Sequence, residues 1–185
     1  KLGLPFGKKI VGNIAALVGH KDHATLLRAA REVIDQRQDV LFVIIGEGEL
    51  RPELLKLREQ LQLDAHVRFL GHVPEAQQYL SAFDVFAMSS CMEGLGSIVL
   101  DSFASGVPVV ATAGGGLPEL VRDNETGLLV GVGNSIALAR SILKLLDDGA
   151  LAKKLAADAQ RWVDENCSVG KMAEKYLEIY RKALP

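Results

Sequence analysis

The stretch VLFVIIGEG, residues 40–48, begins with six consecutive apolar residues and ends in a glycine-rich turn. A run that is apolar at every position, rather than at alternate positions, is typical of a strand buried on both faces of a parallel sheet. A segment of helical period follows the glycines directly. This stretch therefore predicts one strand–turn–helix unit of an α/β fold.

The same unit recurs on both sides of this stretch. Further short apolar runs lie at 9–15, 67–70, 85–88 and 108–112, with a weaker one at 127–130. Segments of helical period lie at 22–37, 51–61, 75–82, 97–105 and, briefly, 117–121. This alternation predicts a Rossmann-like, doubly wound parallel sheet of about six strands with helices on both faces.

After Gly133 the pattern changes to helical period alone. Three helical segments follow, at 135–146, 150–165 and 169–183. Ser135 and Ser168 are the expected caps of two of them, and Gly149 is an expected stop. The sheet domain is therefore expected to end in a helical carboxy-terminal tail, on which Trp162, Tyr176 and Tyr180 are expected to be packing residues.

Length and composition indicate one packed domain. The chain has 185 residues, of which 49% are hydrophobic and 24% charged, so residues 1–185 have the material for a single core. The chain opens at Lys1 with a loop-like stretch up to residue 7. We therefore expect a domain excised from a longer protein.

The charge, the cysteines and the hydropathy of the chain indicate which partners it can bind and in which cell compartment it works. The 21 basic and 23 acidic residues are interleaved and give a net charge of −2, so no strong field exists to hold nucleic acid. Cys91 and Cys167 lack a metal-binding spacing and fit a reducing cytoplasm. No apolar run approaches the roughly 18 to 20 residues of a membrane span, and no signal-peptide pattern is present. We expect a soluble, cytoplasmic domain.

Glycine-rich loops follow the predicted strands, at the edge where open parallel sheets bind ligands. One of them, Gly46-Glu47-Gly48, begins like a dinucleotide fingerprint, but Arg51 stands where that fingerprint has its third glycine. No acidic residue offers itself for a ribose at the usual distance either, so a nicotinamide cofactor is disfavoured. The glycines indicate either a tight turn or a close approach of the backbone to a ligand.

The strongest motif is EGLGSIVLD, residues 93–101, which leads from the run at 85–88 into a helix. Glycines let backbone N–H groups approach an anion, and the helix that begins near Ser97 points its positive end at the same place. A phosphate fits there. Asp101, one turn into the helix, is placed to reach hydroxyls of an attached sugar, and Glu93 is free for a second polar group. The alternative is a surface glutamate, a turn and a helix with one exposed aspartate.

This motif and its flanks resemble the retaining GT-B glycosyltransferases of the large "group 1" family (family 4-like). The matching segments are ASGVPVVAT at 104–112, GGLPELV at 115–121, NETGLLV at 124–130, FLGHV at 69–73 and IIGEGELR at 44–51. They cover nearly the whole chain in the family's order. The resemblance implies one half of a GT-B fold, namely the carboxy-terminal donor-binding domain, with the amino-terminal acceptor domain absent.

The resemblance also implies roles for individual residues. The donor-binding residues would be Gly46, Gly48, Arg51, Gly71, His72, Val73, Gly94, Leu95, Gly96, Ser97, Ile98 and Asp101. Among them, the backbone at 71–73 would hold the nucleotide base, and Asp101 would hold the ribose where the family has a glutamate. Lys21 and Glu93 would be the catalytic residues.

One departure from the family pattern concerns cations. The family has an arginine and, five residues later, a lysine that neutralise the departing diphosphate; Lys21 matches the lysine, but Ala16 occupies the arginine position. Stabilising a departing charge is often the largest catalytic contribution. Either Arg51 or a residue of the absent domain replaces the arginine, or the protein is a slow or inactive relative.

The resemblance implies a full-length enzyme that moves a hexosyl or related group from a nucleotide diphosphate sugar to an acceptor hydroxyl, with retention of configuration. No metal site and no cofactor are expected, because no Asp-x-Asp motif occurs. The isolated domain is expected to catalyse little or nothing, and any membrane association would come through the missing half. The alternatives are a non-catalytic nucleotide-sugar-binding relative and a sugar-nucleotide epimerase of GT-B build.

Overall fold

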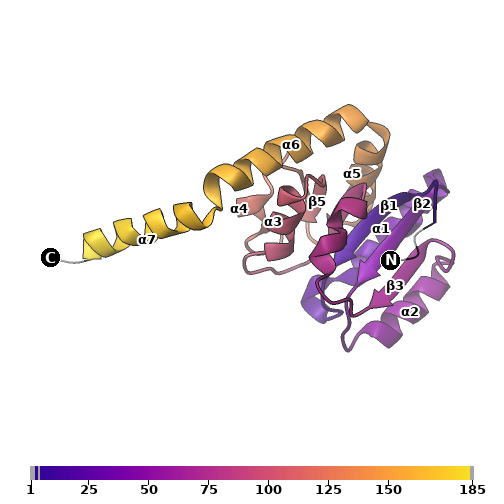
Figure 1. The fold of residues 1–185 in the computed structure, drawn as a ribbon. Coiled ribbons are helices and arrows are strands. Elements are labelled where there is room, and N and C mark those ends of the chain that lie inside the picture. Colours follow the sequence, from indigo (N-terminus) through magenta and orange to yellow (C-terminus); the bar gives the residue numbers. More distant parts are fainter. Residues whose placement is uncertain (1–2, 4, 184–185) are drawn as a thin grey trace.

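Six parallel strands form one sheet in the order β3-β2-β1-β4-β5-β6 (Figure 1). The computed structural model describes residue 3 and residues 5–183. The strands are β1 (Lys9–Ile14), β2 (Val40–Ile45), β3 (Val67–Gly71), β4 (Val85–Met88), β5 (Val109–Thr112) and β6 (Leu128–Val130). The predicted doubly wound parallel sheet is confirmed.

Helices cover both faces of this sheet. They are α1 (His23–Gln36), α2 (Arg51–Gln60), α3 (Ser97–Ala104), α4 (Leu117–Leu120), α5 (Ser135–Asp147), α6 (Gly149–Asn166) and α7 (Val169–Ala183), with short 3-10 helices η1 (Gly19–Lys21) and η2 (Ala76–Ala82). One hydrophobic layer joins the sheet to α1, α2 and α5. The other joins it to η2, α3 and α4, while α6 contributes to both layers.

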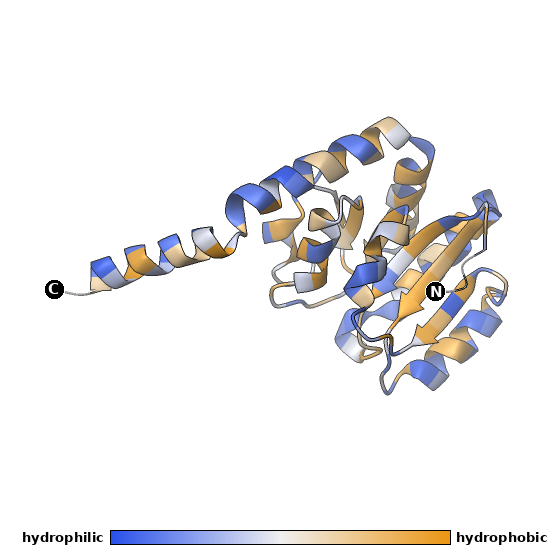
Figure 2. Ribbon diagram, in the orientation of Figure 1, coloured by the Kyte–Doolittle hydropathy of each residue, from blue (hydrophilic) through white to orange (hydrophobic). Residues whose placement is uncertain are grey.

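The local sequence explains why these elements form. All six residues of β2 are buried, as a strand covered on both faces requires. Its side chains alternate between the two layers, with Phe42 and Ile44 in one and Leu41 and Val43 in the other. Helix α1 begins after Asp22, whose side chain accepts a hydrogen bond from the Thr25 N–H at 3.2 Å. Figure 2 shows the result, with strongly apolar strands between helices of mixed hydropathy.

Several boundaries differ from the predictions. Asn134 rather than Ser135 caps α5, because its side chain accepts from the Ala137 N–H at 2.9 Å. Gly149 begins α6 instead of stopping a helix, since Asp148 caps α6 through the Leu151 N–H. The predicted helix at 75–82 is a 3-10 helix over Ala76–Ala82. The Ser168 cap is confirmed by the bond that its hydroxyl accepts from the Lys171 N–H at 3.2 Å.

The last helix projects away from the rest of the molecule (Figure 1). No residue of α7 that the structure describes is buried. Its large apolar side chains, including Met172, Tyr176, Ile179 and Tyr180, are more than half exposed. The expectation that Tyr176 and Tyr180 pack is therefore wrong for the described residues, whereas Trp162 on α6 packs against the second layer.

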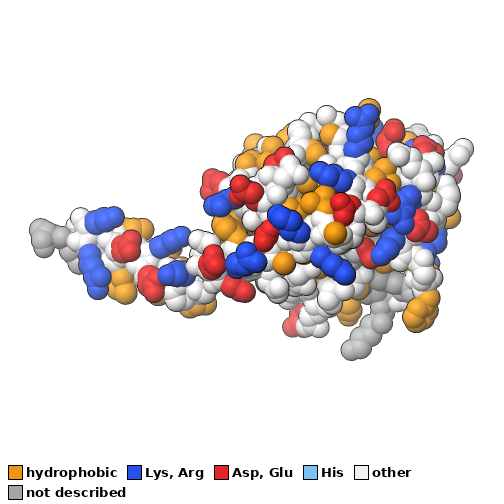
Figure 3. Space-filling model, turned by 90° about the horizontal axis from the view of Figure 1, so that it is seen from above, with side chains coloured by type: hydrophobic (Ala, Val, Ile, Leu, Met, Phe, Trp, Pro, Cys, Tyr) orange, Lys and Arg blue, Asp and Glu red, His pale blue; other side chains and the backbone are white. Residues whose placement is uncertain are grey.

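The face that Figure 3 shows has no large patch of one charge, because Lys and Arg side chains lie among Asp and Glu side chains. This mixture fits the net charge of −2. Among the described residues, no helix combines the length and the hydropathy of a membrane span.

Candidate functional site

The order in which the chain adds strands to the sheet reverses between β1 and β4, which are neighbours. The chain winds one way from β1 through β2 to β3 and the other way from β4 through β5 to β6, so α1 after β1 and α3 after β4 lie on opposite faces of the sheet. In open α/β sheets, the crevice at this switch point is where ligands bind. Lys21 is the last residue of η1, in the connection after β1, and Glu93 lies in the loop after β4.

The side chains of Lys21 and Glu93 meet in this crevice. The Lys21 Nζ lies 2.5 Å from the Glu93 Oε1, and their side chains are 18% and 8% exposed. A partly buried ion pair is screened less by solvent and salt than one on the surface. The structure thus brings together the two residues that the resemblance assigned to catalysis, although 72 positions separate them.

Two buried serines hold the residues of this ion pair in place. The Ser90 hydroxyl donates to the Glu93 Oε1 at 2.7 Å, and the Ser89 hydroxyl donates to the Lys21 carbonyl at 3.0 Å. Both serines are buried at 1% exposure. The loops are also joined directly, because the Cys91 N–H donates to the His20 carbonyl at 2.9 Å. We had not predicted a role for these serines; their place at the end of a buried strand was the available signal.

The glycine run at 114–116 supports the loop that carries Glu93. A Cβ on Gly114 would collide with the Ser90 carbonyl, one on Gly115 with the Glu93 backbone, and one on Gly116 with the Gly94 carbonyl. The Gly116 N–H donates to the Glu93 carbonyl at 2.9 Å. These glycines therefore allow two backbones to pack together, a role that the sequence analysis did not assign to them.

The loop 93–96 ends at the amino terminus of α3. Gly96, in the left-handed conformation with φ of 65°, precedes the helix without a side-chain cap, so the first-turn amides of Ser97 and Ile98 have no partner within the helix. Gly94, Leu95, Ser97 and Asp101 are exposed. Ser97 and Asp101 share one helix face by their spacing of four residues. The motif predicted this arrangement of a glycine loop at a helix amino terminus, and free amides in such an arrangement can bind an anion.

A hollow of about 420 Å³ opens at the carboxyl ends of β1, β2 and β3. This strand-end hollow is lined by Ile14, Ala15, Ala16, Ile45, Gly46, Glu47, His72, Val73, Glu75, Ala76 and Gln77. Its size lies in the usual range for small-ligand pockets, about 300–1,000 Å³. Gly46, His72 and Val73, all predicted donor-binding residues, therefore line one wall.

The other predicted residues of this region, Gly48, Arg51 and Gly71, do not line the hollow. A Cβ on Gly48 would collide with the Leu17 carbonyl, and a Cβ on Gly71 would lie 2.7 Å from the Glu47 Oε1. Arg51 does not line the hollow; its Nη1 lies 2.9 Å from the Glu47 Oε1. The charge of Arg51 is thus already opposed by Glu47, on a side chain that is one-third exposed (33%).

A buried histidine lies directly after Lys21 and Asp22. The His23 Nε2 lies 3.1 Å from the Asn13 Oδ1, and the Asn13 Nδ2 donates to the Ala87 carbonyl at 2.8 Å. The Asn13 Oδ1 must then accept, so Nε2 carries the proton, while the buried Nδ1 has no partner. Burial lowers the pKa of His23 to about 4, with a smaller contribution from the Lys21 charge. His23 is therefore a neutral anchor, which we had not predicted.

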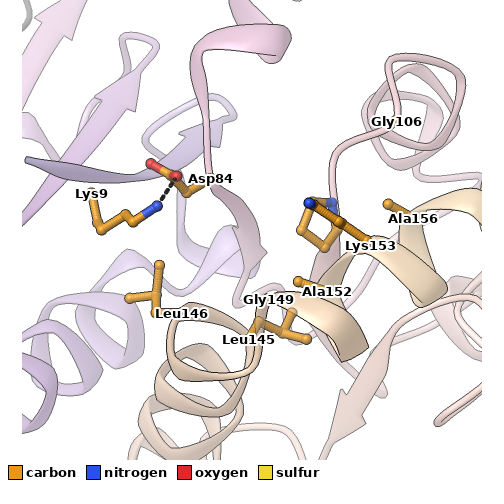
Figure 4. Close-up of a pocket in the computed structure, with 10 residues that line it drawn as sticks. Lys9, Asp84, Gly106, Leu145, Leu146, Gly149, Ala152, Lys153 and Ala156 are labelled. Atoms are coloured by element: carbon orange, nitrogen blue, oxygen red, sulfur yellow. Dashed lines mark hydrogen bonds and ion pairs between the residues drawn. The ribbon is translucent and has the colours of Figure 1, made fainter.

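A second, smaller hollow of about 220 Å³ lies at the opposite end of the sheet (Figure 4). It is lined by Lys9, Asp84, Gly106, Pro108, Leu145, Leu146, Gly149, Ala152, Lys153 and Ala156. Lys9 and Asp84, which its walls include, form an ion pair at 2.8 Å. None of the predicted site residues lines this hollow, so it is separate from the switch-point crevice.

The sheet order, the switch-point crevice and the glycine loop that leads into α3 define a Rossmann-like domain of the kind found in GT-B glycosyltransferases. The chain belongs to the family described as glycosyl transferases group 1, whose model matches residues 1–162.

Individual relatives agree with this assignment. The lipopolysaccharide core biosynthesis glycosyltransferase LpsE of Rhizobium meliloti is 33% identical over 179 residues, which are 97% of this chain and 52% of LpsE. The crystal structure of Anabaena HepE in complex with UDP matches with a TM-score of 0.88 and 25% identity, over 95% of this chain and 49% of HepE. The C-terminal domain of the group 1 glycosyltransferase LpcC from Francisella tularensis matches with a TM-score of 0.81 and 27% identity, over 88% of each chain.

The chain spans about half the length of the curated relatives that it matches, 52% in the case of LpsE.

Proposed function

We propose that this chain is the donor-binding half of a retaining glycosyltransferase, which moves a sugar from a nucleotide diphosphate sugar to an acceptor hydroxyl. The observation that carries the proposal is the meeting of Lys21 and Glu93, 2.5 Å apart, at the switch point in front of the α3 amino terminus. An ammonium, a carboxylate and free helix amides are thereby grouped where a charged ligand binds.

In this proposal the diphosphate lies between Lys21 and the amides of Ser97 and Ile98. Charge builds up on the diphosphate as the bond to the sugar breaks, and fixed donors aimed at that charge lower the barrier. These donors belong to the protein, so the proposed reaction needs no metal and no cofactor. Glu93 orients the sugar.

The nucleoside extends from the diphosphate towards the strand-end hollow. Asp101 holds the ribose, and the backbone at 71–73 meets the base, as the resemblance implies. The hollow has room for a base, at about 420 Å³. The similarity to HepE, which was crystallised in complex with UDP, supports the binding of a nucleotide.

The acceptor site belongs to an amino-terminal domain in this proposal, since the chain spans about half of its relatives. The unpartnered apolar side chains of α7 supply a surface for that domain. The 185-residue chain would then bind the donor and show little or no turnover.

Because Cys91 and Cys167 are both free, we place the enzyme in the cytoplasm. We propose no nucleic-acid partner and no membrane contact of this domain.

Titration calorimetry of the 185-residue chain tests the proposal. UDP-, GDP- and ADP-sugars are titrated with and without magnesium, into the unsubstituted chain and into Asp101→Ala and Glu93→Ala. Asp164→Ala is the matched control, because Asp164 is an exposed aspartate on α6 far along the chain. We expect one nucleotide class to bind without magnesium and Asp101→Ala to weaken it. Equal binding by Asp101→Ala and Asp164→Ala would refute the ribose role.

One observation favours a second candidate, a non-catalytic nucleotide-sugar-binding relative. Ala16 lines the strand-end hollow where the family pattern has an arginine, and Arg51 is paired with Glu47 instead of facing the hollow. Donor binding by the full-length protein without any transfer or hydrolysis would select this candidate.

A further inference from the structure

The carboxylate of Glu93 is held through one of its two oxygens. Oε1 accepts from the Lys21 ammonium at 2.5 Å and from the Ser90 hydroxyl at 2.7 Å. Among the described residues, Oε2 makes no hydrogen bond and is not one of the buried atoms without a partner. Oε2 is therefore the oxygen that remains open to a ligand.

The two groups that hold Oε1 differ in mobility. Lys21 reaches Glu93 through a flexible four-carbon chain. Ser90 has a single side-chain torsion before its hydroxyl, is 1% exposed, and has its carbonyl bonded by the buried Thr112 hydroxyl of β5 at 2.6 Å. Gly114 packs against the same carbonyl. Ser90 is thus fixed from the sheet, whereas Lys21 is free to change partner.

Donor binding gives Lys21 a reason to change partner. A diphosphate carries more negative charge than the single carboxylate that faces Lys21 in this structure, and it enters the crevice as an anion needing a cation. When the ammonium turns towards the diphosphate, Glu93 loses one of its two hydrogen bonds. Without a second partner, its carboxylate would rotate away from the position that addresses the sugar.

We propose that Ser90 is a positioning residue: its hydroxyl keeps the Glu93 Oε1 in place when Lys21 turns to the donor diphosphate, so that Oε2 faces the donor sugar. This inference rests on the proposed function and adds a residue to it. It also separates two recognition steps, because Ser90 acts on the sugar through Glu93 and does not act on the nucleotide.

The test compares Ser90→Ala with the unsubstituted full-length protein. Thr126→Val is the control, because Thr126 is also buried, at 4% exposure, and loses a hydrogen bond of similar length, 2.8 Å to the Leu120 carbonyl, outside the proposed site. The probes are UDP-glucose, UDP-N-acetylglucosamine, GDP-mannose and ADP-glucose, each beside the free nucleotide diphosphate. Dissociation constants come from calorimetry, and kcat and KM from release of the nucleotide diphosphate.

We expect Ser90→Ala to weaken binding of the nucleotide sugar, or to lower kcat, by at least about tenfold. This is the effect expected when one hydrogen bond to a charged group is lost. Binding of the free nucleotide diphosphate should change less than about twofold, because that ligand lacks the sugar. Equal weakening of both ligands, or no change in either, would overturn the inference.

A second comparison keeps the test decisive if Ser90→Ala is less stable than the unsubstituted protein. In a Glu93→Ala background, Ser90→Ala should have no further effect on nucleotide-sugar affinity, since its only route to the sugar has been removed. An additional tenfold loss in that background would overturn the inference. If the unsubstituted protein binds none of the four nucleotide sugars, the proposed function itself fails, and the two failures are thereby distinguished.

Discussion

Ala16 lines the strand-end hollow at the position where the family pattern has an arginine, so this wall lacks that positive charge. If the missing cation limits turnover, Ala16→Arg in the full-length protein should raise kcat for transfer by about 10²-fold, because one electrostatic contact to a developing charge contributes on the order of 2.7–4 kcal/mol. Initial rates at saturating donor measure the effect. Ala150→Arg, an exposed position at the start of α6, is the control for added charge. An unchanged rate would show that Lys21 and other groups already suffice.

His23 links protonation to stability. Its pKa in the folded chain is about 4, against an ordinary value of 6.5, so between these values the unfolded chain binds a proton that the folded chain does not. Stability therefore falls as the pH drops from about 6.5 towards 4, by roughly 3 kcal/mol in total from this residue.

Urea unfolding at pH 7.5 and pH 5 measures this contribution. His23→Gln keeps an amide able to bond Asn13 but cannot titrate, so we expect its stability to fall less between the two pH values than that of the unsubstituted chain. Equal losses in the two proteins would contradict a neutral, buried His23.

At the scale of elements, the glycine run at 114–116 holds the Glu93 loop against the end of β5. Gly114→Ala should therefore both destabilise the chain, by about 1–3 kcal/mol, and weaken nucleotide-sugar binding, because the new methyl group displaces the Ser90 carbonyl. Thermal unfolding and calorimetry measure the two effects. Gly131→Ala has open space around its Cβ and should change neither. If Gly114→Ala changed neither stability nor nucleotide-sugar binding, the position of the Glu93 loop would not depend on its packing against Gly114.

The strands and most helices were predictable because each depends on a local pattern. A run such as 40–45 can only be buried on both faces, and the amphipathic stretch that became α1 starts at a capping aspartate. The errors arose where neighbours compete. Asn134 and Ser135 can both cap a helix, and Gly149 can either end one helix or begin the next, so the choice depends on tertiary packing.

The sequence predicted candidate site residues but not the contacts between them. The spacing of Glu93, Gly96 and Asp101 places them on one loop and one helix turn, which is local information. The contact of Lys21 with Glu93, 72 positions apart, depends on the order of the strands, which places β1 beside β4. The roles of Ser90 and His23 depend on hydrogen bonds inside the folded core, for which the sequence carries no separate signal.

At the scale of the whole molecule, α7 has an apolar side without a partner among the described residues. Replacing Met172, Tyr176 and Tyr180 together by glutamine should leave the stability of the 185-residue chain nearly unchanged, because these side chains are already more than half exposed. The same replacement should lower the melting temperature of the full-length protein, where we propose that the amino-terminal domain covers them. Differential scanning calorimetry of both proteins tests this pair of outcomes. Equal changes in the two proteins would count against docking of α7.

Helix α6 contributes Leu155 to the layer on one face of the sheet and Ala159 to the layer on the other. Neither layer can therefore melt without exposing part of this helix, and losing α6 opens both layers at once. The two faces should behave as a single cooperative unit, with amide hydrogens in α1 and α3 exchanging through one shared opening. A ligand that tightens the loops on one side would then slow hydrogen exchange on the far side of the sheet as well.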